Sequence, residues 1–102
     1  MEIYKAPIQD YAFLFDVLNY DALVEFENFA EFDRETTLAI AEEAARFCTE
    51  QALPLNRVGD KEGVSYNPED KSVTTPECFK ALYAKYVESG LGGLTKPVEF
   101  GG

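Results

Sequence analysis

The side chains best suited to covalent chemistry in this sequence are two cysteines, Cys48 and Cys78, and the chain contains no histidine. A catalytic thiol or hydroxyl usually needs a neighbouring base, and histidine most often supplies it. A structural zinc site needs the close spacing Cys-x-x-Cys, which these two residues lack. We therefore interpret both cysteines as packed thiols, and the sequence leaves open a disulfide between them.

The acidic stretch at residues 60–70 superficially suggests a calcium-binding loop. An EF-hand loop needs oxygen ligands at alternate positions and a glycine at the sixth position. Counted from Asp60, the fifth and sixth residues are Val64 and Ser65, so the stretch does not fit this template. A solvated turn is the better interpretation, and we assign no metal ligand.

Two further patterns resemble a phosphate-binding loop and an acid–base pair, but neither fits the requirements of such a site. The glycine-rich residues 90–93 follow an expected helix, whereas phosphate-binding loops have a strand before the glycines and a helix after them. Glu42 and Glu43 could act as an acid–base pair only if both were buried, but adjacent residues on a helix diverge by about 100°. We therefore assign no catalytic and no cofactor-binding residue.

The composition indicates a globular and acidic protein. The 102 residues are 46% hydrophobic and 14% aromatic, and 19 acidic against 9 basic residues give a formal net charge of -10. This charge argues against binding to nucleic acid or to an anionic membrane surface. No signal peptide and no membrane-spanning run is recognisable, so we expect a cytoplasmic protein.

The elements that must position these side chains are mainly helices, because the apolar residues recur at helical spacing. Proline, glycine and N-cap residues then set the boundaries of each helix. We expect a helix at residues 11–18 with Asp10 as N-cap and a short helical piece at 22–26. A long helix is expected at 34–52, with Asp33 as N-cap and Pro54 as the stop. The last helix is expected to begin at Thr75-Pro76-Glu77, with Thr75 as N-cap, and to end at Gly90.

The helix expected at residues 34–52 carries the clearest apolar stripe. Because many residues of this stripe are small, we expect another helix to approach it closely inside a bundle. Glu42 and Arg46 are expected to pair on the opposite, solvated face. Phe26, Phe29 and Phe32 repeat at three-residue intervals and are expected to anchor their connector onto the core. The stripe consists of Leu38, Ala41, Ala45, Cys48 and Ala52, widened by Ile40, Ala44 and Phe47.

Residues 55–74 show no helical stripe, and we expect an irregular loop there. Residues 67–70 favour a type I turn, which could join two very short strands at residues 64–66 and 72–74. The expected fold class is all-α: a helical domain forming a partial bundle, with a long irregular loop and room for one very short hairpin.

Four collinear segments resemble the acyl-CoA dehydrogenase family. Residues 88–102 are similar to the helix end and the Gly-Leu…Pro…Tyr/Phe-Gly-Gly stretch of its N-terminal domain. Residues 53–63, Leu-Pro-Leu-Asn-Arg-Val-Gly-Asp-Lys-Glu-Gly, resemble a segment of a branch with larger subunits. In that branch, residues 1–10 correspond to an N-terminal extension and residues 73–76 to the start of the next helix.

The resemblance implies that residues 1–32 are an extension with short helices and that residues 33–102 belong to the N-terminal helical domain, truncated at its C-terminal end. Family members are FAD enzymes that introduce an α,β double bond into an acyl-CoA thioester. Their catalytic carboxylate and flavin contacts lie mainly in the middle and C-terminal domains. We therefore expect this fragment to bind no cofactor and to be inactive alone, to meet those domains, to help wall the acyl pocket and to form a homo-oligomer.

Two other classes of protein share some of these sequence features. A free-standing acidic helical module for protein interaction would explain the negative charge and the lack of an active site. Against it stands the Phe-Gly-Gly ending at residues 100–102, which closes no element. An acyl-carrier protein needs a serine in an Asp-Ser-Leu context, which Ser65, Ser72 and Ser89 do not offer.

Overall fold

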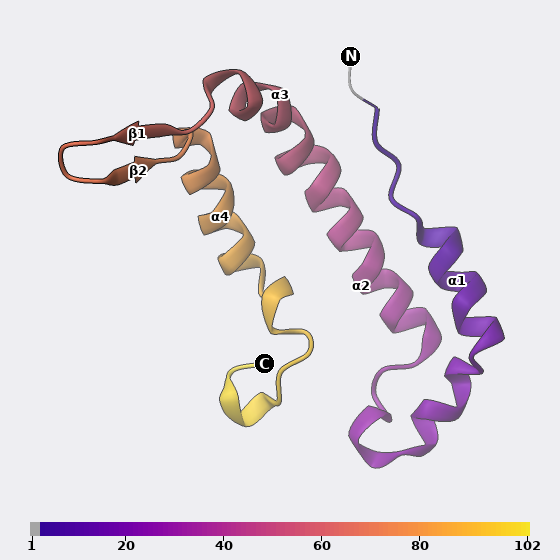
Figure 1. Ribbon diagram of the computed structural model, residues 1–102. Coiled ribbons are helices and arrows are strands. Elements are labelled where there is room, and N and C mark those ends of the chain that lie inside the picture. Colours follow the sequence, from indigo (N-terminus) through magenta and orange to yellow (C-terminus); the bar gives the residue numbers. More distant parts are fainter. Residues whose placement is uncertain (1–2) are drawn as a thin grey trace. The chain divides into compact units, whose positions relative to one another are not determined.

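A computed structural model describes residues 3–102 of the chain (Figure 1). The backbone forms two compact units, which divide between residues 49 and 50. Helices dominate both units, and the strands are confined to one hairpin, so the mostly helical fold class is confirmed. No helix within the described part of the chain is both long and apolar enough to cross a membrane.

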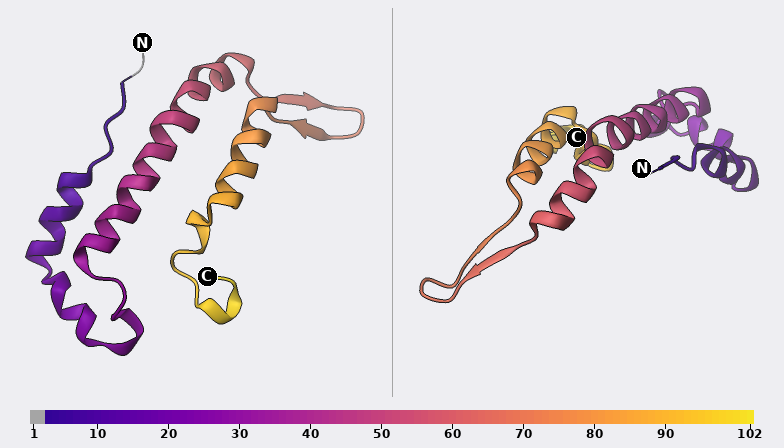
Figure 2. Two further views of the ribbon diagram at one scale, coloured as in Figure 1. Left: turned by 180° about the vertical axis from the view of Figure 1, so that it is seen from behind. Right: turned by 90° about the horizontal axis from the view of Figure 1, so that it is seen from above.

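The first unit pairs two helices, α1 (Ile8–Val17) and α2 (Arg34–Phe47), which lie side by side and run antiparallel (Figures 1 and 2). Two short 3₁₀ helices, η1 (Tyr20–Glu25) and η2 (Glu27–Phe29), connect them. The expected helical piece at residues 22–26 is thus present in the tighter 3₁₀ form. Between α1 and η1 the chain turns at Asn19, whose φ of 53° is left-handed.

Helix α1 begins earlier than the sequence predicts. Its N-cap is Pro7, so the expectation of Asp10 as N-cap is wrong, and no side chain caps this end by a hydrogen bond. Proline is favoured at a helix start because its φ is already restricted and it has no N–H to satisfy. Asp10 instead lies within the first turn, where its negative charge complements the helix dipole.

The start of α2 agrees with the sequence. The Asp33 carboxylate accepts a hydrogen bond of 2.8 Å from the backbone N–H of Thr36, as expected of an N-cap. The apolar stripe is half-buried along its length, while Glu42, Glu43 and Arg46 are exposed. The predicted pairing of Arg46 with Glu42 is wrong, because its guanidinium lies 2.8 Å from Glu43, one residue closer along the helix.

The chain remains helical where an end and an irregular loop were expected. A π-helical turn, η3 (Cys48–Ala52), follows α2 and leads into α3 (Leu53–Glu62). Pro54 therefore does not end the helical stretch; it lies in the first turn of α3, where the missing N–H breaks no helical hydrogen bond. The irregular loop shrinks to the residues around Gly63, whose φ of 67° closes α3.

An antiparallel hairpin links α3 to α4 and projects away from both helices of the second unit (Figure 2). Its strands are β1 (Ser65–Asn67) and β2 (Ser72–Thr74), so the expected hairpin is confirmed with the first strand one residue later. Tyr66 faces Val73 across the pair. The turn is closed by hydrogen bonds from the Glu69 N–H to the Asn67 side chain, 3.0 Å, and from the Ser72 N–H to the Asp70 carboxylate, 2.9 Å.

Helix α4 (Glu77–Ser89) begins one residue later than expected. Its N-cap is Pro76, with a ψ of 134°, so the assignment of Thr75 as N-cap and Pro76 as first helical residue is wrong. The extended ψ places Pro76 outside the helix, where its ring is buried. Gly90 ends the helix at a φ of 76°, as predicted. Two 3₁₀ turns follow, η4 (Leu91–Gly93) and η5 (Val98–Phe100).

Neither unit buries an apolar core among the described residues. Phe26, Phe29 and Phe32 are 62%, 47% and 45% exposed, so their expected role as core anchors is wrong within this chain. A pair of helices covers only one side of each helix, and a further layer is needed to enclose a core. Cys48 and Cys78 are both half-buried free thiols.

Candidate functional site

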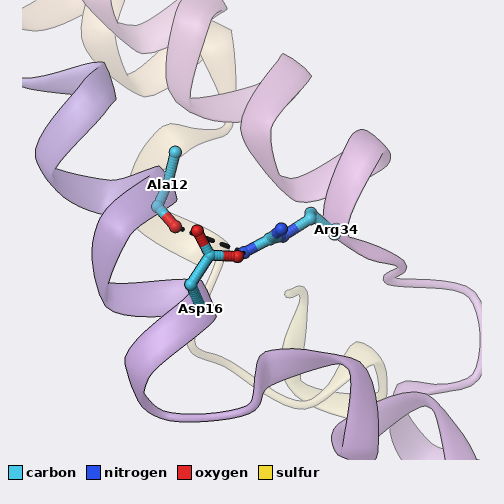
Figure 3. Close-up of polar contacts among 3 residues, drawn as sticks. All are labelled: Ala12, Asp16 and Arg34. Carbon is cyan, nitrogen blue, oxygen red and sulfur yellow. Dashed lines mark hydrogen bonds and ion pairs between the residues drawn. The ribbon is translucent and has the colours of Figure 1, made fainter.

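The best-defined side-chain cluster of the first unit joins α1 to the start of α2 (Figure 3). The Arg34 guanidinium donates a 3.2 Å hydrogen bond to the Ala12 carbonyl of α1 and forms an ion pair with the Asp16 carboxylate. A cation at a helix N-terminus opposes the helix dipole, and the Asp16 carboxylate offsets this effect. The Arg34 Nε is buried and has no hydrogen-bond partner among the described residues.

A second group of contacts centres on Tyr20. Its hydroxyl donates to the Phe32 carbonyl at 2.8 Å and shares a 2.5 Å hydrogen bond with the Thr37 hydroxyl. Because the Tyr20 proton serves the carbonyl, Thr37 is the donor in the second bond. The Tyr20 ring stacks on Phe15, with centroids 4.3 Å apart and planes 25° apart. Tyr20 therefore ties η1 to α1 and to the first turn of α2. We call the contacts of Arg34 and Tyr20 the polar joint.

The polar joint can fix geometry, but it lacks the features of a catalytic site. No basic group lies beside a nucleophile in it, and its titratable side chains are an arginine, an aspartate and a tyrosine. None of these contacts is predicted from the sequence. The hydrogen-bonded and ion-paired partners are separated by 12 to 22 residues, so no local pattern could have indicated them.

An open cleft of about 730 Å³ lies between the segment leading into α1 and the C-terminal half of α2. It is lined by Tyr4, Lys5, Ala6, Pro7, Ile8, Gln9, Asp10, Glu42, Ala45 and Thr49. The Thr49 hydroxyl donates to the Ala45 carbonyl at 2.9 Å and so has no proton left to offer a ligand. The charged lining residues are one lysine and two carboxylates, a set with no nucleophile–base pair.

The patterns that suggested chemistry in the sequence have structural roles. Residues 90–93 form the αL cap of α4 and the turn η4. The stretch 60–70 divides between the end of α3 and the hairpin, and no group of three potential metal ligands gathers anywhere in residues 3–102. Glu43 is engaged by Arg46, whereas Glu42 lines the cleft.

The resolved pKa shifts also have local structural causes. The backbone N–H of Thr36 holds the pKa of Asp33 below its usual value, and the Thr36 side chain adds to the effect. Hydrogen bonds from the Ser72 side chain and backbone lower the pKa of Asp70. Both carboxyls are exposed and stabilise a helix start and a turn. A catalytic acid or base ordinarily has its pKa moved toward neutrality instead.

Comparison with known proteins identifies two relatives. The chain is 35% identical over 100 residues to a 3-methylmercaptopropionyl-CoA dehydrogenase of Ruegeria pomeroyi, a match that covers 97% of this chain and 17% of that protein. It is 26% identical over 89 residues to a butyryl-CoA dehydrogenase of Syntrophomonas wolfei, covering 86% of this chain and 14% of that protein. No protein-family model and no solved structure matches the chain.

Both relatives are acyl-CoA dehydrogenases, so the chain is homologous to one part of enzymes of this family, and the resemblance noted in the sequence is confirmed. The chain spans only about a sixth of the length of either relative. The rest of each relative has no counterpart among the 102 residues.

Proposed function

We propose that this chain, which is related to the acyl-CoA dehydrogenases, is the N-terminal helical part of such an enzyme. The full protein would introduce an α,β double bond into an acyl-CoA thioester and use FAD as the oxidant. The observation that carries this proposal is the match along 97% of the chain at 35% identity to only 17% of a 3-methylmercaptopropionyl-CoA dehydrogenase. The parent enzyme would be cytoplasmic and homo-oligomeric.

The described residues do not fit a flavin nucleotide, and we place FAD in the parts of the enzyme outside this chain. A pyrophosphate is best held by backbone N–H groups at a helix N-terminus. The glycines at residues 90–93 instead follow the C-terminal end of α4, where the helix dipole repels an anion. The net charge of -10 opposes phosphate binding further. No step of the reaction is therefore assigned to a residue of this chain.

The role we assign to the chain is structural, with its helices packing on the rest of the enzyme and helping to wall the acyl pocket. Residues 1–32 would be an extension with short helices, and residues 33–102 would begin the helical domain. The support is the exposed apolar surface of the second unit, since folded proteins rarely leave large apolar patches in water. On α4, for example, Tyr83 and Val87 are 67% and 59% exposed.

A free-standing acidic interaction module remains the second candidate. It is favoured by the combination of exposed aromatic side chains and acidic residues in the first unit. Such a module would work as a 102-residue protein and would need no flavoenzyme attached to it. The two candidates therefore differ in the size and colour of the native product.

The test is the intact mass and the absorbance spectrum of the protein as its native source makes it. We expect a product several times heavier than 11.4 kDa that carries flavin and oxidises an acyl-CoA. The 102-residue chain, produced alone, should show neither flavin absorbance nor turnover. A native product of 11.4 kDa would favour the interaction module. Flavin-dependent activity of the chain alone would overturn the structural role.

A further inference from the structure

The stretch from Ala6 to Asp33 combines negative charge with aromatic side chains in a way that the proposed function does not explain. It contains no lysine and no arginine. Its seven acidic residues are Asp10, Asp16, Asp21, Glu25, Glu27, Glu31 and Asp33. Of these, only Asp16 is ion-paired within residues 3–102, and Asp33 is engaged as the N-cap of α2. The other five carboxylates are exposed and have no cationic partner in the described chain.

Helix α1 presents an apolar arc on the side away from α2. Phe13, Leu14, Val17 and Leu18 are 65%, 45%, 62% and 74% exposed. At 3.6 residues per turn they span an arc of about 140°. The half-buried Ile8, Ala12 and Phe15 and the Arg34-paired Asp16 lie on the remaining side of the helix. The polar joint therefore fixes which side of α1 turns outward.

Exposed carboxylates lie within this apolar arc and in the segment that follows it along the chain. Asp10 falls within it by helical spacing, and Asp21, Glu25 and Glu27 follow in η1 and η2. The exposed apolar residues of α4 have different neighbours, since Lys80 and Lys85 lie on the same helix as Glu77 and Glu88, and Lys80 pairs with Glu77. The charges of α4 are therefore balanced, whereas α1 and the segment after it carry only carboxylates up to Asp33.

We propose that the outward arc of α1 is a docking surface for a basic amphipathic helix of a partner protein. The apolar stripe of such a helix would cover Phe13, Leu14, Val17 and Leu18, and its flanking Lys or Arg side chains would meet the acidic rim. A second copy of this chain is a poor occupant, because each copy carries a net charge of -10. The inference does not rest on the proposed function, since it concerns a surface of the chain alone.

The test uses the 102-residue chain and a synthetic amphipathic peptide of leucine and lysine as the probe. A peptide of the same pattern with glutamate in place of lysine is its control. We expect the leucine–lysine peptide to bind and the leucine–glutamate peptide not to bind. Binding should weaken several-fold as the Debye length falls from about 30 Å at 0.01 M salt to about 3 Å at 1 M.

Paired variants localise the binding. Phe13→Gln with Val17→Gln should weaken it about tenfold or more, as expected for the apolar centre of an interface. Tyr83→Gln with Val87→Gln on α4 is a matched control, with the same spacing and similar exposure, and should leave binding unchanged. If circular dichroism shows that the α1 variant has lost helicity, a triple variant with Asp10→Asn, Glu25→Gln and Glu27→Gln is used in its place. That variant should weaken binding at low salt and leave it unchanged at 1 M.

Three outcomes would overturn the proposal: equal binding of both peptides, equal loss in the α1 and α4 variants, or salt-independent affinity. Self-association of the chain through Phe13 and Val17, seen by sedimentation, would make the occupant a second copy. Binding to vesicles of neutral lipid through the same residues would make it a membrane. Each of these results is independent of whether the native protein carries flavin, so the proposed function is judged separately.

Discussion

The two units of this chain keep their helices together by different means. In residues 1–49 the helices α1 and α2 are joined by directional polar contacts of Arg34 and Tyr20. In residues 50–102 the helices α3 and α4 meet where Gly59 has no side chain: a Cβ at Gly59 would lie 2.0 Å from the Phe79 ring. One exposed hydrogen bond, from Lys85 to Gln51 at 2.7 Å, supplements that contact.

The two units should therefore be sensitive to different kinds of substitution. Neither unit buries an apolar core among the described residues, so each depends on few contacts. A polar contact is broken by removing one donor or acceptor and is weakened by salt. A close approach at a glycine is broken by adding atoms and responds little to salt.

Gly59→Ala should show whether stability at this position depends more on steric room beside Phe79 or on helix propensity. Alanine in α3 gains about 0.5–1 kcal/mol of helix propensity over glycine, whereas overpacking against Phe79 costs about 1–3 kcal/mol. We expect a net loss of about 1–2 kcal/mol in the free energy of unfolding, measured by urea denaturation. In a Phe79→Ala background the same change should become stabilising. A loss of equal size in both backgrounds would show that Phe79 is not the obstacle.

Arg34→Met should destabilise the first unit by about 1 kcal/mol, because Ala12 and Asp16 lose their shared partner. Methionine keeps much of the apolar length of the side chain. The ion pair is partly exposed, so the effect should shrink in 1 M salt, measured by amide hydrogen exchange in α1. Arg46→Met, which removes the exposed pair with Glu43, is the control and should have a smaller effect. An unchanged exchange rate in α1 would contradict the polar joint.

Tyr20→Phe should cost about 0.5–1.5 kcal/mol, the usual contribution of a hydrogen bond, while keeping the ring on Phe15. The Thr37 amide at the start of α2 should exchange faster. Tyr11→Phe is a matched control, because the Tyr11 side chain is 44% exposed. If both variants behaved alike, the hydroxyl of Tyr20 would have no role in joining η1 to α2.

The Asp33 cap should give the smallest effect, and its sign follows from the lowered pKa. The folded-state pKa lies below the usual value of 3.8, so the unfolded chain binds the proton more readily. The cap therefore stabilises α2 above the unfolded pKa, and this contribution is lost as pH falls through the folded value. The Thr36 amide chemical shift should titrate with a midpoint below 3.8, and Asp33→Asn should abolish the transition. A midpoint at or above 3.8 would contradict the cap.

The first unit was predictable where its signals are local. The stripe on α2 recurs at three and four residues, and Asp33 caps an N–H three residues away. The αL glycine that ends α4, Gly90 in the second unit, is an equally local signal. The polar joint was missed because Arg34 meets Asp16 across 18 residues and Tyr20 meets Thr37 across 17. No spacing rule within a single helix reaches such partners.

In the second unit, the sequence pattern at α3 predicts a loop where the structure has a helix. The missing helical stripe and the glycines Gly59 and Gly63, after a helix stop at Pro54, predict an irregular loop over residues 55–74. In the structure Pro54 falls in the first turn, where it is tolerated, and Gly59 is the residue that lets Phe79 approach. The contact with α4 is thus the reason for a glycine in mid-helix.

The charge of -10, the absence of histidine, the stripe of α2 and the family resemblance follow from the amino-acid sequence, because composition and short-range periodicity are properties of the chain. Tertiary packing sets which side of α1 faces outward, which carboxylate pairs with Arg34 and why Gly59 lies in a helix. These features depend on residues that are distant in sequence and become neighbours only when the helices pack.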